Sequence, residues 1–433
     1  EEYAKIGINL ELHYATISDI IARTFGNYNQ STYEGGGYDA LLIERGQGFD
    51  PDAVRVYYHS DGWPPNGGNI AFYTDGRLDR LMDAAAEETN FTRRKELYWE
   101  INEMVREAMI DNWLYYPKIT MLTKKSILNV TPFVDLRSAE NWTVEGKTRA
   151  DNVTVVFAQG GEIDALNPLF MGSGYAARPL FLVLGGAVIR WSTNGTLIKG
   201  VITDHYEFSP DYMNVTFYLK KGIKWHDGYN FTAWDIKCYY DALLDPETGS
   251  WGTYSAQSWL KNVTVVDNYT VTFQLVKKMA PNLVLVQLSY EEGYMPYHIL
   301  KDVPHKDWKT HWTNTERAIG YGPFKWYEWK KGEYLVLKAN PDYIGGEPFI
   351  DNLVVRVIPD SSTAYAALKS GDVDVLSAWY GFTSLAKEAE EDPDLRVYTS
   401  LVTGVTALFL NNLHPQLSNK YVRYALAYAT PRD

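Results

Sequence analysis

The sequence predicts a mixed α/β protein with more than one domain. Short runs rich in β-branched and aromatic residues, such as 153–158 and 270–276, alternate along the chain with helix-like runs such as 233–244. The 433 residues leave room for two to three domains and a large core. Because strands and helices alternate with both short and long connections, we expect an α/β fold with mixed sheets.

The first 131 residues are predicted to form strands around a pair of helices. Residues 1–6 read as the last turn of a helix that Gly7 closes. The second of the paired helices has Thr92 as its predicted N-cap. The predicted strands are 7–14, 38–43 and 117–131, and the predicted helices are 17–28, 75–90 and 92–111.

Residues 132–152 turn polar and lose their periodicity, so we predict a linker there. A new series of elements begins at residue 153. Its predicted strands are 153–158, 215–220, 263–266, 270–276, 335–338 and 353–358, and its predicted helices are 233–244 and 361–369. The acidic run 387–394 is expected to be a solvated helix end.

Composition excludes several classes of protein. A net charge of -13 argues against nucleic-acid binding. No apolar run approaches the roughly 18–20 residues that span a bilayer. The lone Cys238 cannot form an internal disulfide, lies in a helix-like run and is expected to be buried. Aromatic residues make up 15% of the chain, and we expect some of them to line a groove for flat ligand faces.

Ten Asn-x-Ser/Thr sequons predict surface loops of an extracellular glycoprotein. They lie at Asn29, Asn90, Asn129, Asn141, Asn152, Asn194, Asn214, Asn230, Asn262 and Asn268. The alternative is that Asn-Val-Thr simply recurs at strand ends. No signal peptide or lipid-anchor cysteine is visible, so we expect the true N-terminus, with any membrane anchor, to lie outside this sequence.

From residue 153 onward the chain resembles solute-binding family 5, the oligopeptide, dipeptide and nickel type of extracellular solute-binding proteins of ABC importers. Eight segments stand in family order over about 280 residues. They are Leu166-Asn167-Pro168, the Phe217 to Gly228 signature that ends in Trp225-His226-Asp227-Gly228, Thr232-Ala233-Trp234-Asp235, Val266 to Val271, Gly320 to Phe324, Asn340 to Tyr343, Lys369 to Asp374, and Val422 to Ala429.

Residues 1–131 resemble the C-terminal part of the same family, so the two parts stand in swapped order. The matching segments are Lys5 to Ile8, Tyr38 to Ala40, Asp50 to Asp52 with Ser60, Asp75 to Asp79, and the Arg93 to Met109 helix. A circular permutant, a fragment spanning two tandem copies, and the loss of an insertion all fit this order.

The resemblance implies a periplasmic-binding-protein-like fold of two α/β lobes (class II, cluster C) with an extra small domain. We therefore expect residues 1–131 to form part of lobe 2 and return to lobe 1. Residues 153–400 would form lobe 1 with the extra domain, and residues 401–433 would enter lobe 2. An incomplete lobe of this kind could also self-associate.

The His226-Asp227-Gly228 signature is predicted to be structural, because a Gly turn followed by the Thr232 cap and Asp235 is turn and capping chemistry. The other histidines lack metal-ligand spacing, and no nucleophile elbow or P-loop occurs. We therefore predict no enzyme activity, no metal and no cofactor.

The resemblance implies a ligand site between the lobes. We predict that it is lined by Gln47, Phe49, Tyr175, Trp379, Tyr380 and Thr403. In peptide-binding members the loop around Gln47 supplies an Asp that pairs with the peptide ammonium, and here Gln47 aligns with it, unless the loop is shifted by one to three residues. An enclosed ammonium without a carboxylate is destabilised by roughly 3–5 kcal/mol, about two to three orders of magnitude in affinity. Either Glu44, Asp50 or Asp52 substitutes, or the ligand is neutral.

We therefore expect the solute-binding protein of an ABC importer, which captures an oligosaccharide or an oligopeptide and delivers it to the permease. A neutral oligosaccharide is slightly favoured, since aromatic faces stack on sugar rings. The rivals are a structural cell-surface or filament protein on the same fold, and a glycosidase, which would need two facing buried carboxylates.

Overall fold

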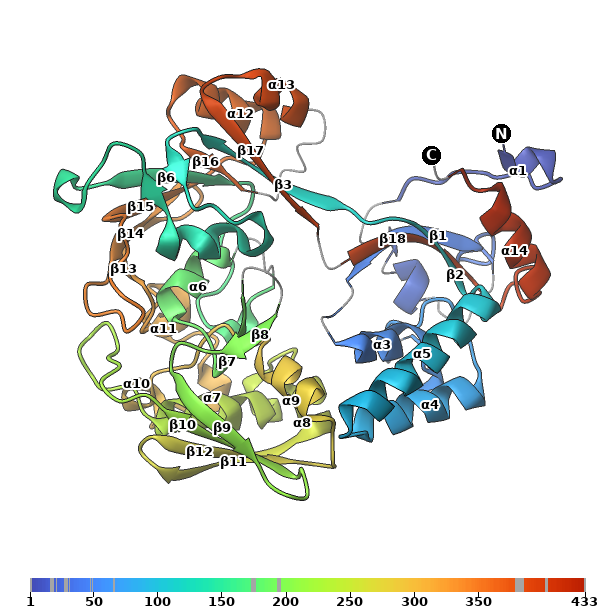
Figure 1. Cartoon of the computed structure of the whole chain (residues 1–433), viewed down its shortest axis with the longest axis horizontal. Coiled ribbons are helices and arrows are strands. Elements are labelled where there is room, and N and C mark those ends of the chain that lie inside the picture. The colour runs from blue at the N-terminus through green and yellow to red at the C-terminus, as the bar shows by residue number, and fades with distance from the viewer. Residues whose placement is uncertain are drawn as a thin grey trace. The chain divides into compact units, whose positions relative to one another are not determined.

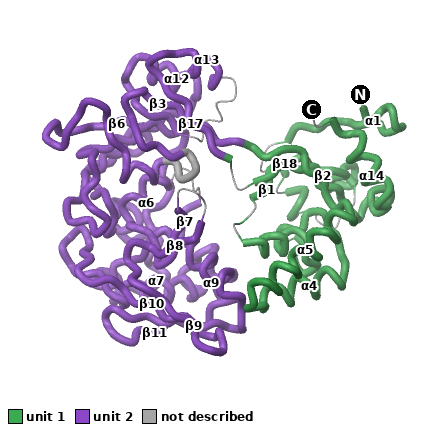
Figure 2. Tube along the Cα trace, in the orientation of Figure 1, with its two compact units in different colours: residues 1–117, 401–433 green, residues 118–400 purple. Residues whose placement is uncertain are grey.

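The computed structural model describes the chain except for residues 1, 16–18, 21, 27–29, 31, 47, 49, 65–66, 173–176, 193–195, 378–384, 402–403 and 432–433. The chain divides into two compact units (Figure 2). Unit 1 comprises Glu1–Pro117 and Leu401–Asp433, and unit 2 comprises Lys118–Ser400.

Unit 1 is built around a three-stranded antiparallel sheet of order β1-β18-β2 (Figure 1). The central strand comes from the C-terminal end of the chain, and both edge strands come from the N-terminal part. The strands are β1 (Ala40–Gly46), β18 (Gly404–Leu410) and β2 (Asp111–Tyr115). Unit 1 is therefore closed by segments from opposite ends of the sequence.

Helices cover this sheet and form the core of unit 1 with it. They are α1 (Glu2–Lys5), α3 (Val54–Tyr58), α4 (Gly76–Glu87), α5 (Phe91–Ala108) and α14 (Lys420–Ala429), with short turns η1 (Ala22–Gly26), η2 (Pro51–Ala53) and η3 (Ser60–Gly62). Arg423 of α14 is buried and donates to the carbonyls of Ala108 and Met109. This contact joins the C-terminal helix to the end of α5.

Unit 2 contains a seven-stranded sheet of order β13-β14-β15-β6-β16-β3-β17. The strands are β13 (Phe324–Lys330), β14 (Tyr334–Ala339), β15 (Asn352–Val357), β6 (Thr154–Gln159), β16 (Val375–Leu376), β3 (Lys118–Lys124) and β17 (Leu395–Leu401). Strand β6 runs parallel to both of its neighbours, β15 and β16. The sheet is mixed, because β13, β14 and β3 pair antiparallel.

A second sheet in unit 2 has four strands in the order β11-β12-β10-β9, and helix α7 packs on it. Its strands are β9 (Thr203–Phe208), β10 (Asn214–Leu219), β11 (Leu260–Asp267) and β12 (Thr270–Leu275). Two strand pairs, β4 (Ile127–Leu128) with β5 (Thr143–Val144) and β7 (Ile189–Trp191) with β8 (Leu197–Lys199), lie beside the main sheets.

The helices of unit 2 connect these strands and cover both sheets. They are α6 (Arg178–Leu184), α7 (Ala233–Leu244), α8 (Thr253–Trp259), α9 (Pro281–Leu288), α10 (Tyr297–Leu300), α11 (Trp312–Thr315), α12 (Ser361–Ser370) and α13 (Leu385–Glu391). Short turns are η4 (Pro132–Asn141), η5 (Arg149–Asp151), η6 (Pro168–Phe170), η7 (Pro246–Thr248) and η8 (His305–Asp307).

Three local predictions were wrong. Residues 7–14 form no strand, although Ile8 packs against the apolar cluster of Leu410, Leu417 and Leu426. The N-cap of α5 is Asn90 rather than Thr92, since its side chain accepts from the Arg93 amide at 3.0 Å.

The third error concerns residues 132–152, which are not a linker. They belong to unit 2 and contribute the fully buried Leu136, Ala139 and Trp142 to its main core. The Trp142 indole donates to the Ser138 hydroxyl at 2.7 Å, so even its polar atom is satisfied inside the core.

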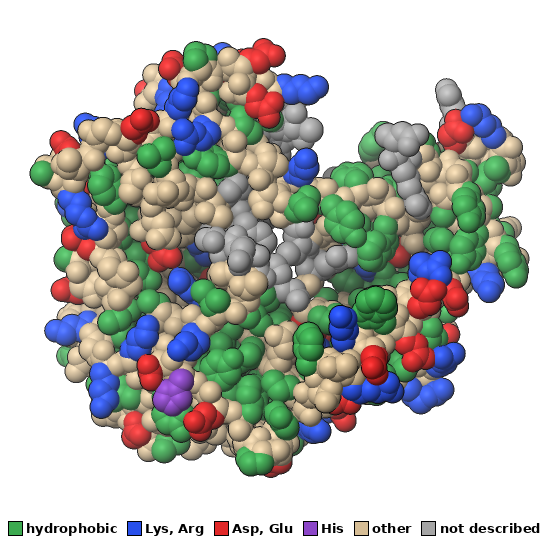
Figure 3. Space-filling model, viewed as in Figure 1, with side chains coloured by type: hydrophobic (Ala, Val, Ile, Leu, Met, Phe, Trp, Pro, Cys, Tyr) green, Lys and Arg blue, Asp and Glu red, His purple; other side chains and the backbone are tan. Residues whose placement is uncertain are grey.

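The surface mixes charges of both signs over the face drawn in Figure 3. Among the helices of the described ranges, none has the length and hydropathy needed to cross a membrane.

Candidate functional site

All six residues predicted to line the ligand site lie outside the described residues. They are Gln47, Phe49, Tyr175, Trp379, Tyr380 and Thr403. The described residues next to them nevertheless define two strand edges, one in each unit, from which these loops leave.

The edge in unit 2 lies at the carboxyl ends of parallel strands. The register pairs Gln159 of β6 with Val357 of β15, and Ala158 of β6 with Leu376 of β16. The next residue, Ser377, continues this register through its amide, which donates to the Ala158 carbonyl at 2.9 Å. Two strands that come later in the chain thus flank β6, one on each side. The chain thus adds one strand on one side of β6 and the next parallel strand on the other side. Open α/β sheets bind ligands at the carboxyl ends of strands where the strand order reverses in this way.

The loop that leaves β6 is held by buried amide side chains. Asn314 Oδ1 accepts from the backbone amides of Leu166 at 3.0 Å and Asn167 at 2.8 Å. The fully buried Asn167 in turn caps η6 by accepting from the Leu169 amide at 3.0 Å. The Leu166-Asn167-Pro168 motif therefore fixes this loop at the sheet edge instead of contacting ligand through its Asn side chain.

The edge in unit 1 is formed by the paired ends of β1 and β18. Gly46 lies opposite Gly404 in the register, and the Tyr57 hydroxyl donates to the Gly46 carbonyl at 2.6 Å. Gln47 follows Gly46 and Thr403 precedes Gly404 in the sequence. Two of the predicted ligand residues are therefore joined to directly opposed positions of one strand pair.

Two of the three carboxylates considered for the ligand ammonium have partners inside unit 1. Asp50 is 2% exposed and makes a bidentate ion pair with Arg94, with Nη1–Oδ2 and Nη2–Oδ1 distances of 2.9 and 2.6 Å. Asp52 accepts from the Tyr98 hydroxyl at 2.7 Å, and burial raises the pKa of its carboxyl. Glu44, on β1, is exposed.

Sequence reasoning missed the buried cation next to this loop. Arg45 is 5% exposed, lies over the rings of Tyr57 and Tyr58 at 4.5 and 4.9 Å, and forms an ion pair with Asp111 at 3.3 Å. Burial raises the pKa of Asp111 despite this Arg partner. The cluster lies at the end of β1, and its signal in the sequence was an Arg at the end of a mainly apolar strand.

The His226-Asp227-Gly228 signature has a structural role in the described contacts. The His226 amide donates to the Gly320 carbonyl at 2.8 Å, and its Nε2 lies 3.1 Å from the Gly322 carbonyl. Burial lowers the pKa of His226 to about 4, so the ring is neutral near pH 7. Thr232 and Asp235 form the capping box of α7. No cluster of metal-ligating side chains occurs within the described ranges.

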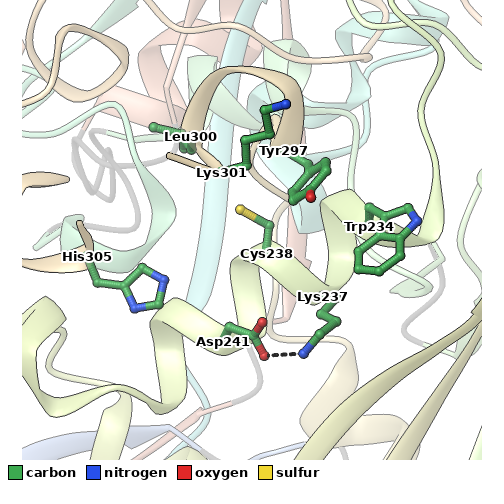
Figure 4. Close-up of a pocket in the computed structure, with 8 residues that line it drawn as sticks. All are labelled: Trp234, Lys237, Cys238, Asp241, Tyr297, Leu300, Lys301 and His305. Atoms are coloured by element: carbon green, nitrogen blue, oxygen red, sulfur yellow. Dashed lines mark hydrogen bonds and ion pairs between the residues drawn. The ribbon is translucent and has the colours of Figure 1, made fainter. Parts of the chain in front are cut away.

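A small cavity of about 110 Å³ lies within unit 2, between α7 and α10 (Figure 4). Trp234 and Tyr297 stack on one side of it, with ring centroids 5.6 Å apart, and the Lys237–Asp241 ion pair of 2.8 Å closes another. Cys238 contributes a thiol whose pKa burial raises to about 12, so the thiol is not a nucleophile near neutral pH.

The sequon asparagines lie mainly at the surface. Asn29 and Asn194 lie outside the described residues, and Asn214 is half-buried. The other seven are exposed, namely Asn90, Asn129, Asn141, Asn152, Asn230, Asn262 and Asn268.

Two α/β units, one of which has loops leaving the ends of parallel strands, are the architecture of a solute-binding protein. The chain matches the family described as "Bacterial extracellular solute-binding proteins, family 5 Middle" over residues 196–433, which is more than half of its length. The chain belongs to this family, which consists of substrate-binding transport proteins.

Several curated proteins are similar to parts of the chain. The oligopeptide-binding protein AppA of Bacillus subtilis is 35% identical over 216 residues, 50% of this chain and 38% of that protein. A putative ABC transporter peptide-binding protein of Brucella ovis is 31% identical over 239 residues, 54% of this chain and 43% of its own length. The solved structure of AppA with a nonapeptide is 29% identical, covers 51% of this chain and 43% of that chain, and has a TM-score of 0.48. The chain spans about half the length of the curated relatives it matches.

Proposed function

We propose that the protein is the ligand-binding subunit of an ABC importer and captures an oligopeptide for delivery to a membrane permease. The observation that supports this function best is the position of β6 between two later parallel strands, β15 and β16. Loops at such a strand edge bind small molecules in open α/β sheets, and the family match over residues 196–433 includes β15 and β16 of this sheet.

We propose that loops at each of the two strand edges contact the solute. In unit 2 these are the segments that follow Gln159 and Ser377, and in unit 1 they are the segments next to Gly46 and Gly404. Phe49, Tyr175, Trp379 and Tyr380 would provide aromatic faces, and Gln47 and Thr403 would provide hydrogen bonds.

The oligopeptide class is favoured by relatives above 30% identity that are named as peptide-binding proteins. A peptide brings a terminal ammonium, and Asp50 and Asp52 are both engaged inside unit 1. Glu44 is the remaining candidate, because its carboxylate is exposed on β1, three residues before Gln47. The same engagement of Asp50 and Asp52 favours the second candidate class, a neutral oligosaccharide, which needs no carboxylate.

Calorimetry of the purified protein separates these classes. Peptides of three to nine residues are titrated in parallel with α- and β-linked glucose oligomers. We expect micromolar or tighter peptide binding and about tenfold or greater weakening in Glu44→Gln. Glu96→Gln, an exposed carboxylate on α5, serves as the matched control. Sugar binding without a peptide response would refute the oligopeptide proposal.

We propose further that the protein acts outside the cell as an anchored glycoprotein. Seven exposed sequon asparagines support this proposal. Intact-mass measurement of protein from its native source, before and after enzymatic deglycosylation, is expected to show a mass decrease. A mass equal to that of the bare chain would exclude glycosylation. Light scattering tests the rival filament role, which requires concentration-dependent assembly.

A further inference from the structure

We propose that a cavity on the loop leaving β6 binds a carboxylate group, with Lys309 and Lys331 as its cationic partners. The cavity has a volume of about 240 Å³ and lies entirely within unit 2. The inference rests on the proposed function, since it assigns the cavity to the carboxylate end of the peptide.

The cavity is built on the same loop as the candidate site. Ile163, Asp164 and Ala165 line it, four to six residues after the end of β6. The Glu162 carboxylate accepts from the Gly332 amide, so the β13–β14 turn is tied to this loop. The loop and the turn that carries Lys331 therefore form one wall.

Aromatic and aliphatic side chains make the apolar part of the cavity. Ile163 and Ala165 are 4% and 7% exposed, and Phe170 and Trp329 complete this surface. Trp329 is itself held edge-on by Trp326, with ring centroids 5.4 Å apart. An apolar side chain of a ligand would contact these groups.

Two lysines give the rim of the cavity its charge. Lys331 Nζ lies 4.6 Å from the centre of the Trp329 ring and 3.3 Å from the Thr315 carbonyl, which directs it to the rim. The Lys309 backbone carbonyl accepts from the buried Asn314 Nδ2 at 2.7 Å, so the backbone of Lys309 is held in place. The lining residues thus include two lysines and one carboxylate, Asp164, whose Oδ2 already accepts from the Gly172 amide at 2.9 Å.

These features identify the chemistry of the ligand group. A surplus of one positive charge beside an indole ring favours a carboxylate attached to an apolar side chain. The cavity is smaller than the roughly 300–1,000 Å³ of sites that enclose a whole ligand. It would therefore hold one end of a peptide, its last residue with the free carboxylate, while the rest extends along the edge of β6.

The test compares peptides that end in a free carboxylate with the same peptides as C-terminal amides. We expect the wild-type protein to bind the acids about tenfold more tightly than the amides in calorimetry. The double variant Lys309→Gln/Lys331→Gln should bind both forms equally and match the wild type in its affinity for the amides. The control variant Lys306→Gln/Lys330→Gln removes two neighbouring lysines that do not line the cavity and should keep the tenfold preference.

A second probe, N-acetyl-tryptophan against N-acetyl-tryptophanamide, has no ammonium and tests the cavity independently of peptide capture. Peptide binding without an acid preference overturns the carboxylate site and leaves the proposed function standing. If no peptide binds, the peptide proposal fails, and lysine-dependent binding of N-acetyl-tryptophan still supports the cavity site. Absence of both responses overturns both proposals. Circular dichroism confirms that each variant is folded.

Discussion

Replacement of Arg94 by Met should destabilise unit 1 strongly, because Arg94 makes a buried ion pair with Asp50. Its guanidinium makes two hydrogen bonds to Asp50, and its Nε donates to the Ala85 carbonyl at 3.0 Å. Both members of the pair are more than nine-tenths buried. Removing one member of a buried pair leaves an uncompensated charge and costs about 3–5 kcal/mol. We expect a loss of that size in the free energy of unfolding.

The adjacent residue provides a matched control on the same helix. Arg93 pairs with Glu96 at 2.9 Å, but their side chains are 58% and 59% exposed. Exposed pairs contribute about 0–1 kcal/mol, so Arg93→Met should shift unfolding by less than 1 kcal/mol. Both variants lose an arginine from α5, and only one loses a buried partner.

Urea unfolding followed by circular dichroism gives the two free energies. Hydrogen exchange of peptides from α5 assigns the loss to unit 1. The double variant Asp50→Asn/Arg94→Met should be less destabilised than the sum of the single variants, because the uncompensated charge is removed. Equal unfolding free energies for Arg94→Met and Arg93→Met would refute the role assigned to the buried pair.

Three further predictions follow from the described contacts. Cys238 should not react with a thiol reagent at pH 8 in the folded protein, since burial raises its pKa to about 12, and should react fully in denaturant. Burial raises the pKa of Glu291 from 4.5 to about 7. Its stabilising contribution is therefore complete below about pH 4.5 and lost as pH rises through 7, and Glu291→Gln should flatten this dependence of the unfolding free energy by about 3 kcal/mol. Gly322→Ala should lower the melting temperature markedly, because its Cβ would lie 2.2 Å from the Leu182 carbonyl oxygen, whereas Gly76→Ala, whose Cβ would lie at an ordinary contact distance of 3.6 Å from Arg80 Nη1, should not.

The accuracy of the local predictions depended on whether a signal was complete within a short stretch. Helix α7 was predicted with its observed bounds, because Thr232 and Asp235 form a capping box and the apolar periodicity begins directly after it. The start of α5 was misplaced because Asn90 and Thr92 are both good cap residues, and backbone geometry selects Asn90. Such a choice depends on the path of the chain before the helix.

The predicted linker failed for a different physical reason. Leu136, Ala139 and Trp142 are spaced by three residues, which is the period of the 3-10 helix η4 that leads into Trp142. That spacing places three side chains on one buried face although the residues between them are polar. A search for periods of 2 and 3.6 residues overlooks such a face. In the sequence, the large apolar side chain of Trp142 was the local sign that this segment is buried.

The candidate site shows why ligand class is harder to predict than fold. The end of β1 is fixed by Tyr57 on Gly46, and the turn that follows is fixed by Arg94 on Asp50. An acidic residue in this loop could serve either as an internal anchor or as a ligand partner, and both uses look alike in the sequence. The structure assigns Asp50 to the first use, since both of its carboxylate oxygens bond Arg94. Under the functions proposed above, side chains outside these anchors would interact with the charge of the ligand. Glu44→Gln in unit 1 and substitution of the two lysines of the unit 2 cavity are therefore the decisive tests.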